Sequence, residues 1–227
     1  MKNLAIIPAR GGSKRIPRKN IKDFLGKPII AYSIETALQS GLFQEVMVST
    51  DNEDIAAIAK QYGAKIPFIR TNKNADDFAT LADVVEEVVQ NYDKLGKNFD
   101  YYCCILATNP LLQIINLKKG YEQLIHSSFA SVRPIVKFGY PVQRAFKLKN
   151  GKVDFFYPKY KTVRSQDMEP AYHDAGQFYW MRKDGLLSHD NKGGFEIPDY
   201  QVQDIDNETD WYLAELKYNF LLNNKLE

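Results

Sequence analysis

The sequence contains only two cysteines among its 227 residues, and they are neighbours, Cys103 and Cys104. Neighbouring residues of a strand point to opposite faces, so a disulfide between these two is geometrically unfavourable. The chain also lacks a His/Cys spacing typical of zinc sites. We therefore interpret both cysteines as small buried hydrophobic residues in a reduced, cytoplasmic setting.

Long apolar runs and an excess of one charge are also missing. The stretch from Leu4 to Pro8 is too short for a secretory signal, and no run approaches the length of a membrane span. With 30 Lys and Arg against 28 Asp and Glu, the net charge is +2, which gives no general attraction to nucleic acid or membranes. We therefore predict a cytoplasmic protein that binds neither nucleic acid nor membranes. Any anion-binding site must then come from a local cluster of positively charged residues.

Strand-like and helix-like patterns alternate through the first half of the chain. This order predicts an α/β fold with a Rossmann-like, mostly parallel twisted sheet and helices on both faces. The predicted strands are Leu4–Ile7, Val46–Ser49, Lys65–Ile69, Tyr101–Leu106, Ala130–Val136 and Gln177–Met181. The predicted helices are Pro28–Ser40, Asn52–Tyr62, Thr80–Tyr92, Leu117–Ile125 and Thr209–Leu222.

A different pattern appears after the last parallel strand. Two short strands, Arg144–Leu148 and Lys152–Phe156, flank the turn Lys149-Asn150-Gly151, which is typical of a β-hairpin. A hairpin outside a parallel sheet indicates an arm for contact with another subunit. We therefore predict one domain over residues 1–227, with a dimerisation arm inserted at roughly residues 137–170.

The loop after the first strand concentrates glycine and positive charge. In an α/β sheet this position, at the carboxyl end of a strand, is where ligands bind. Gly11 and Gly12 let the backbone approach an anion closely, although their spacing fits neither the Walker A nor the Rossmann motif. Five cations share the segment and repel one another unless an anion is bound: Arg10, Lys14, Arg15, Arg18 and Lys19. The loop predicts a triphosphate cradle, and the alternative is a solvated basic turn.

Asp204 and Asp206 are two residues apart near the C-terminal end of the chain. In an extended segment their carboxylates point to the same side, where they repel each other unless a cation lies between them. Mg²⁺ is usually held by one or two carboxylates together with substrate phosphates, so the pair predicts a magnesium site. Alternatively, Asp206 only caps the last helix.

The basic loop resembles the signature of the acylneuraminate cytidylyltransferases, which make CMP-activated sialic acids. The resemblance covers essentially the whole chain. It continues through Val48-Ser49-Thr50-Asp51, Arg70, Thr108-x-Pro110, Arg164-Ser165-Gln166 and Asp204-Ile205-Asp206. Within the family the chain is most similar to pseudaminic acid cytidylyltransferases, through Tyr140–Ala145, Arg164–Asp167 and Tyr172–Trp180.

The resemblance implies a nucleotide-diphospho-sugar transferase type of fold and a homodimer. It also implies transfer of CMP from CTP to the anomeric hydroxyl of a nine-carbon acidic sugar, with Mg²⁺ held by Asp204 and Asp206. Catalytic roles follow for Arg10, Lys14, Lys19 and Asp204. The implied nucleotide-binding residues are Ala9, Arg10, Gly11, Gly12, Ser13, Lys14, Lys19, Asn20, Arg70, Asp77, Ala79 and Thr80. For Arg70 the alternative is an ordinary surface ion pair.

The resemblance implies the following acceptor-binding residues: Leu106, Thr108, Gln143, Arg144, Arg164, Gln166, Tyr172, His173 and Gln177. Arg164 is the first choice for the sugar carboxylate, and His173 is alternatively a structural histidine. Two departures bear on the acceptor. Ala107, after Leu106, replaces a proline that is common in the family, which bears on contacts to the sugar's tail. Ala175-Gly176 stands where sialic acid enzymes usually carry Asn-Gly, which argues against ordinary sialic acid as the substrate.

The sequence leaves other functions open. They are the use of legionaminic or sialic acid as the acceptor, and a catalytically silent nucleotide-binding protein. A nucleic-acid-binding module is a third, which the near-neutral charge disfavours.

Overall fold

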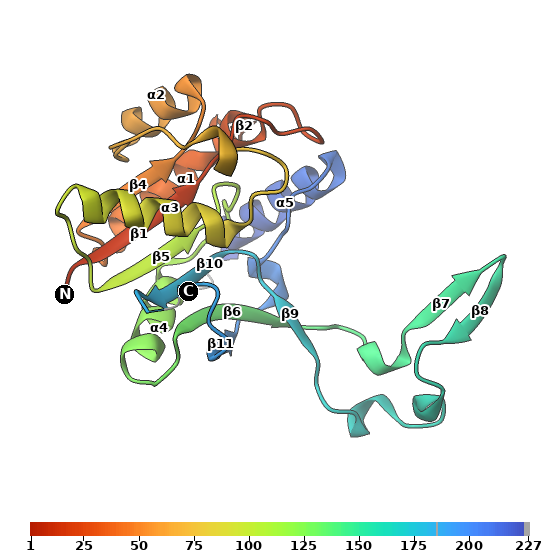
Figure 1. Cartoon of the computed structure of the whole chain (residues 1–227). Coiled ribbons are helices and arrows are strands. Elements are labelled where there is room, and N and C mark those ends of the chain that lie inside the picture. The colour runs from red at the N-terminus through yellow and green to blue at the C-terminus, as the bar shows by residue number, and fades with distance from the viewer. Residues whose placement is uncertain (185, 225–227) are drawn as a thin grey trace.

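The computed structural model describes residues 1–184 and 186–224, drawn in Figure 1. The helices are α1 (Ile29–Gln39), α2 (Glu53–Gln61), α3 (Leu81–Lys94), α4 (Ile114–Ile125) and α5 (Glu208–Asn224). The strands are β1 (Asn3–Pro8), β2 (Asp23–Phe24), β3 (Lys27–Pro28), β4 (Glu45–Ser49), β5 (Tyr101–Ile105), β6 (Ser131–Lys137), β7 (Phe146–Lys149), β8 (Lys152–Phe155), β9 (Tyr172–Asp174), β10 (Phe178–Arg182) and β11 (Lys192–Glu196). All five predicted helices are present. None of the helices in these ranges is both long and apolar enough to cross a membrane.

Seven strands form the central sheet, in the order β11-β6-β10-β5-β1-β4, with β9 paired to β6. Strand β1 is parallel to β4 and β5, and β11 is parallel to β6. Strand β10, however, runs antiparallel to both of its neighbours, β5 and β6. The sheet is therefore mixed, which corrects the prediction of a mostly parallel one.

The antiparallel strand arises from the inserted arm. Strand β6 pairs first with β9, where Ile135 lies opposite Asp174, and then with β10, where Val132 lies opposite Trp180. Between β9 and β10 the chain passes through Gly176 with φ +61°, a conformation that glycine adopts without strain. Because the arm connects the two sides of this long hairpin, the returning strand must run opposite to β6.

The two faces of the sheet are covered by different helices. In β1, Ala5 and Ile7 pack in the cluster that includes residues of α1, α2 and α4, whereas Leu4 and Ile6 pack with α3. The adjacent cysteines follow the same alternation, because Cys103 belongs to the first cluster and Cys104 to the second. The predicted helices on both faces, and the buried unpaired cysteines, are therefore confirmed.

The observed strands differ from the predicted ones in two ways. Lys65–Ile69 is not a strand and makes a single bridge from Lys65 to Met47, because Pro67 has no N–H to continue the pairing. Strands β2, β3, β9 and β11 were not predicted. Strand β11 carries two glycines, which disfavour strands, yet a Cβ atom at Gly193 would lie only 2.4 Å from the Phe129 ring. Close packing, rather than propensity, explains that strand.

The arm consists of residues 138–171 and extends away from the sheet (Figure 1). Its hairpin, β7 and β8, forms a separate two-stranded sheet, as predicted. Asn150 and Gly151 have φ of +51° and +76°, the positive values that a tight two-residue hairpin turn requires.

Candidate active site

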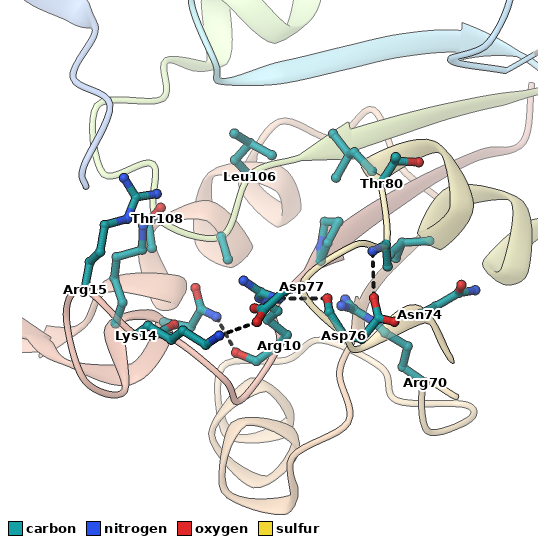
Figure 2. A pocket seen from close by; sticks show the side chains of 18 of the residues that line it. Arg10, Lys14, Arg15, Arg70, Asn74, Asp76, Asp77, Thr80, Leu106 and Thr108 are labelled. Carbon is teal, nitrogen blue, oxygen red and sulfur yellow. Dashed lines mark hydrogen bonds and ion pairs between the residues drawn. The ribbon is translucent and has the colours of Figure 1, made fainter. Parts of the chain in front are cut away.

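A cavity of about 520 Å³ opens where β1 and β5 end. Figure 2 shows side chains from three separate loops that point into it. The loop after β1 contributes Arg10, Ser13, Lys14, Arg15, Ile16, Lys19 and Asn20. The segment before α3 contributes Arg70, Asn74, Asp76, Asp77, Ala79 and Thr80, and the loop after β5 contributes Leu106, Ala107 and Thr108. Of the predicted nucleotide residues, Ala9, Gly11 and Gly12 belong to the first loop without lining the cavity.

Fixed hydrogen bonds shape the loop after β1. The Gly11 amide donates to Asp51 Oδ1 at 2.9 Å, and the Asn20 side chain donates to the Arg10 carbonyl at 2.9 Å. Gly11 also lies against Asn52, since a Cβ at this position would approach that side chain to 3.1 Å. Backbone and side-chain contacts therefore set the loop conformation without a ligand.

Two of the loop's cations share one carboxylate. Arg10 Nη1 lies 2.9 Å from Asp77 Oδ1, and Lys14 Nζ donates to Asp77 Oδ2. These bonds, with Lys14 as the larger cause, hold the pKa of the Asp77 carboxyl below its ordinary value. Arg10 also donates to the Asp76 carbonyl at 2.8 Å. Asp77 thus pairs with the two cations, Arg10 and Lys14, that the family resemblance assigns to phosphate binding.

Arg70 lies on the floor of the cavity and is only 5% exposed. Its Nε donates to Ser49 Oγ at 3.0 Å, and Nη2 donates to the Ser49 carbonyl. Burial lowers the pKa of Arg70, partly opposed by Asp51. The alternative interpretation of Arg70 as a surface ion pair is therefore wrong, because this guanidinium is buried and held in place by β4.

The segment Asp204-Ile205-Asp206 lies beside the basic loop. Ile205 and Ile16 are buried in one apolar cluster with Trp211 of α5, and this brings the neighbouring polar residues together. Lys19 Nζ donates to the Ile205 carbonyl at 2.6 Å and lies 4.0 Å from Asp206 Oδ1. Burial lowers the pKa of Lys19, whereas Asp206 and Asp204 act in the opposite direction.

Asp206 does not cap the last helix. The Asp210 amide donates to Asn207 Oδ1 at 3.1 Å, and the Asn207 amide donates to Asp210 Oδ2 at 3.0 Å. This reciprocal pair is a capping box, so Asn207 is the cap and that alternative for Asp206 is wrong. The Asp206 carboxylate instead faces the basic loop, where Arg15 Nη1 lies 2.7 Å from Oδ2.

Asp204 and Asp206 fit the donor set that magnesium takes in a phosphate site. Within residues 1–184 and 186–224, no group of three or more His, Cys, Asp or Glu side chains gathers as a complete metal cage. Two carboxylates beside a cavity rich in phosphate-binding cations are nevertheless sufficient, because Mg²⁺ usually completes its coordination with substrate phosphates and water.

The predicted acceptor residues are divided between two places. Leu106 and Thr108 line the cavity, whereas the others lie elsewhere: Gln143, Arg144, Arg164 and Gln166 on the arm, and Tyr172, His173 and Gln177 near β9. Arg164 Nε donates to Asp167 at 2.9 Å. Gln166 lines a separate hollow of about 330 Å³ at the base of the arm.

Gln177 is buried and donates to the Gln201 carbonyl at 2.6 Å, while its Oε1 atom has no partner within the described ranges. His173 is exposed, and its ring is tilted by 60° against that of Phe138, with centroids 4.9 Å apart. Its Nδ1 atom lies 2.9 Å from the Asp174 carbonyl oxygen. Neither side chain lines the cavity of its own chain.

Sequence reasoning missed the role of Asp76 in shaping the cavity. Its Oδ1 accepts hydrogen bonds from the amides of Phe78 and Ala79, at 2.9 and 2.7 Å, and so fixes the turn that presents Asp77. Aspartate side chains commonly accept a hydrogen bond from the backbone amide two residues further on and so form a turn. The segment Asp76-Asp77-Phe78 could have predicted this turn from the sequence.

Comparisons with known proteins agree with this geometry. Residues 4–210 match the family model described as cytidylyltransferase. The chain is 46% identical over 225 residues to a pseudaminic acid cytidylyltransferase of Campylobacter jejuni subsp. jejuni, covering 96% of this chain and 97% of that one. It is 33% identical over 219 residues to an N-acylneuraminate cytidylyltransferase of Oncorhynchus mykiss, covering 93% of this chain and 49% of that one.

A solved structure supports the fold. The structure of a CMP:2-keto-3-deoxy-manno-octonic acid synthetase complexed with CTP superimposes with a TM-score of 0.72 at 19% identity, covering 98% of this chain and all of that one. At this identity the likeness concerns the fold alone.

Proposed function

The chain belongs to the cytidylyltransferase family, and we infer that it transfers CMP from CTP to pseudaminic acid and releases pyrophosphate. The single observation that carries this function is 46% identity across nearly the whole chain to a pseudaminic acid cytidylyltransferase. The cavity gives the assignment its chemistry, because five cations line one space at the ends of the parallel strands, and two of them, Arg15 and Lys19, lie beside Asp206.

On the nucleotide side, Arg10 and Lys14 hold the terminal phosphates, and Lys19 stabilises charge at the α-phosphate. The anomeric oxygen attacks the α-phosphorus in line, and the bond from that phosphorus to the bridging oxygen of pyrophosphate breaks. Such transfers depend mainly on positioning and electrostatic stabilisation. Asp204 and Asp206 would hold Mg²⁺, which would supply positive charge at the phosphates. Asp204 is our candidate to accept the hydroxyl proton.

Arg70, Ala79 and Thr80 form the base side of the cavity. Arg70 is fixed by Ser49, so its position is set before the nucleotide binds. A pocket that pairs a cytosine edge is too small for a purine, and we expect turnover with CTP and little with ATP or GTP. Comparable turnover with ATP would contradict this assignment.

On the acceptor side, Leu106 and Ala107 present apolar surface to the cavity. Pseudaminic acid differs from sialic acid in its stereochemistry, in acylated nitrogens at carbons five and seven, and in a terminal methyl group. An apolar wall suits that methyl group, and a site that leaves polar groups unpaired discriminates strongly between related sugars.

A competition between pseudaminic, legionaminic and sialic acids at limiting enzyme tests the acceptor. We expect pyrophosphate to be released fastest with pseudaminic acid. Preference for one of the other two sugars would overturn the acceptor while leaving the cytidylyltransferase assignment intact. CTP binding without pyrophosphate release from any acidic sugar would instead indicate a silent nucleotide-binding protein.

We further propose that the protein is a homodimer in which the arm of one copy reaches the cavity of the other. Phe146, Leu148, Val153 and Phe155 face each other across the hairpin, and the first three side chains of this apolar face are more than half exposed. The predicted acceptor residues Gln143, Arg144, Arg164 and Gln166 belong to the arm yet do not line the cavity of their own chain. A second copy explains both observations.

Mixing two inactive variants tests this arrangement. One variant carries Lys19→Ala in the cavity and the other carries Arg164→Ala on the arm. If the arm serves the partner's cavity, mixed dimers contain one site with both wild-type residues, and activity returns on mixing. Activity that stays absent in mixtures whose dimers have exchanged would contradict the shared site.

A further inference from the structure

We propose that Arg15 binds the carboxylate of the acidic sugar, an inference that rests on the proposed function. Arg15 lies in the cavity, and the resemblance assigns it no role in binding nucleotide, sugar or metal. The argument starts from the chemistry of the acceptor. In an ulosonic acid the carboxylate is attached to the anomeric carbon, which also carries the attacking hydroxyl. The group that binds this carboxylate must therefore lie close to the α-phosphate and the metal carboxylates.

Arg15 lies at that position. It lines the cavity, and its Nη1 atom is 2.7 Å from Asp206 Oδ2, so its guanidinium is fixed beside the predicted metal site. Thr108 of the acceptor side lines the same cavity, and Figure 2 shows Arg15 apart from the Arg10–Asp77 pair. Its side chain is 70% exposed, which leaves most of the guanidinium accessible to a ligand.

The other cations of the basic loop, in the part of the chain that the structure describes, are committed elsewhere. Arg10 and Lys14 are held by Asp77, on the side of the triphosphate. Arg18 pairs with Asp54 at 2.8 Å and does not line the cavity. Lys19 donates to the Ile205 carbonyl.

Two further arginines are less suitable. Arg70 is buried against Ser49 on the base side of the cavity. Arg164, the residue first expected to meet the carboxylate, lies on the arm, where it pairs with Asp167. In the proposed dimer it would reach the sugar from the second copy, whereas Arg15 already lies beside Asp206 in the same chain. Arg15 is therefore the cavity arginine placed on the acceptor side of the reacting centre.

A guanidinium can serve two carboxylates at once. It presents five N–H donors in a planar fork, and a single contact to Asp206 uses one of them. Hydrogen bonds between arginine and a carboxylate are charge-assisted and often bidentate. Arg15 thus joins Asp206 to the sugar carboxylate and orients the anomeric carbon toward the phosphate. A lysine would supply the charge but not this geometry.

The test compares Arg15→Ala with Arg18→Ala, a matched control in the same loop whose arginine points away from the cavity. The measurements are the KM for pseudaminic acid, the Kd for CTP with Mg²⁺ by calorimetry, and turnover of the 1-carboxamide of the same sugar. We expect Arg15→Ala to raise the sugar KM by about 10- to 100-fold, the loss typical of a charge-assisted hydrogen bond. The CTP Kd should change less than about threefold, and Arg18→Ala should alter neither.

The carboxamide separates binding from positioning. The wild-type enzyme should prefer the carboxylate over the carboxamide strongly, and Arg15→Ala should lose that preference, with Arg15→Lys intermediate. If Arg15→Ala keeps the full preference, Arg15 only positions Asp206 and the proposal is wrong. An equal loss of CTP binding would also overturn it, in favour of a triphosphate role. A wild-type protein that turns over no acidic sugar would contradict the proposed function instead.

Discussion

The central sheet and the arm both contain strands with apolar side chains, but these side chains are buried in the sheet and exposed in the arm. In β1 every residue from Leu4 to Ile7 is fully buried, and helices cover both faces of the sheet. In the arm, Phe146 and Leu148 are 58% and 73% exposed. The charges differ as well. Residues 138–171 contain seven Lys and Arg against three Asp and Glu, so the arm carries +4 and the rest of the chain −2.

The contrast shows which part of the molecule is complete within one chain. A two-stranded hairpin is marginally stable alone, and an exposed apolar face of this kind marks an interaction site. The rest of the described chain, residues 1–137, 172–184 and 186–224, is called the body here. It encloses its own core and contains every residue that lines the cavity. The arm is positively charged and apolar on one face, which suits a second, oppositely charged body.

The largest expected effect tests whether the chemistry belongs to the body. Asp204→Asn should lower turnover by about a thousandfold, because one carboxylate cannot hold the metal in place. CTP binding without metal and the melting temperature should stay close to wild type. Glu208→Gln is the matched control, since Glu208 is a nearby exposed carboxylate that pairs with Lys22. A near-normal rate for Asp204→Asn at saturating Mg²⁺ would remove Asp204 from the site.

The next effect tests the arm. If the protein is the proposed homodimer, replacing Phe146 and Leu148 together by serine should make it a monomer, measured by sedimentation, and reduce turnover of the sugar by about a hundredfold. CTP binding should remain, because the nucleotide side lies within the body. Lys147→Ser, on the opposite face of β7, is the control. A variant that is monomeric yet fully active would show that each chain has a complete site.

Arg70→Lys tests the base side of the body. We expect the KM for CTP to rise by about 10- to 30-fold, because lysine cannot reproduce the two contacts to Ser49 while reading a base edge. The KM for the sugar should be unchanged. Lys73→Gln, from the same segment but outside the cavity, should behave as wild type. Equal effects on both substrates would indicate a general loss of structure.

The smallest effect tests the internal ion pairs. Asp77→Asn should lower the KM for CTP by about two- to fivefold, because the triphosphate no longer competes with a carboxylate for Arg10 and Lys14. The pKa of Asp77 is lowered, chiefly by its hydrogen bond from Lys14, which reflects the same contacts. Asp54→Asn releases Arg18 in the same way but outside the cavity, and should have no effect. A raised KM would instead assign Asp77 a direct role in binding the nucleotide.

Prediction from sequence succeeded where the signal was local. All five helices were predicted from patterns within their own segments, and the Asn150-Gly151 turn predicted the hairpin. The basic loop was predicted as one cluster, and the structure brings its residues Arg10, Lys14 and Lys19 to one cavity. In each case the residues that carry the pattern are close together in the chain.

Prediction was weaker where distant segments meet. The direction of β10 depends on the arm that precedes it, and β11 depends on the close approach of Gly193 to Phe129. Neither feature produces a periodic pattern in its own segment. The sequence also could not predict whether the acceptor residues on the arm contribute to the cavity of their own chain or to that of a second copy.

The sequence by itself determined the helices, most of the buried strands, the family and the position of the basic loop, because periodicity and clustered charge act over a few neighbouring residues. Only the tertiary structure decided that Asp77 neutralises Arg10 and Lys14, that Arg70 is buried, and that Asn207 rather than Asp206 caps α5. It alone brought Lys19 to the carbonyl of Ile205, 186 residues away. Burial and ion-pair partners depend on which elements pack together, and that packing is settled by the apolar contacts of the whole chain.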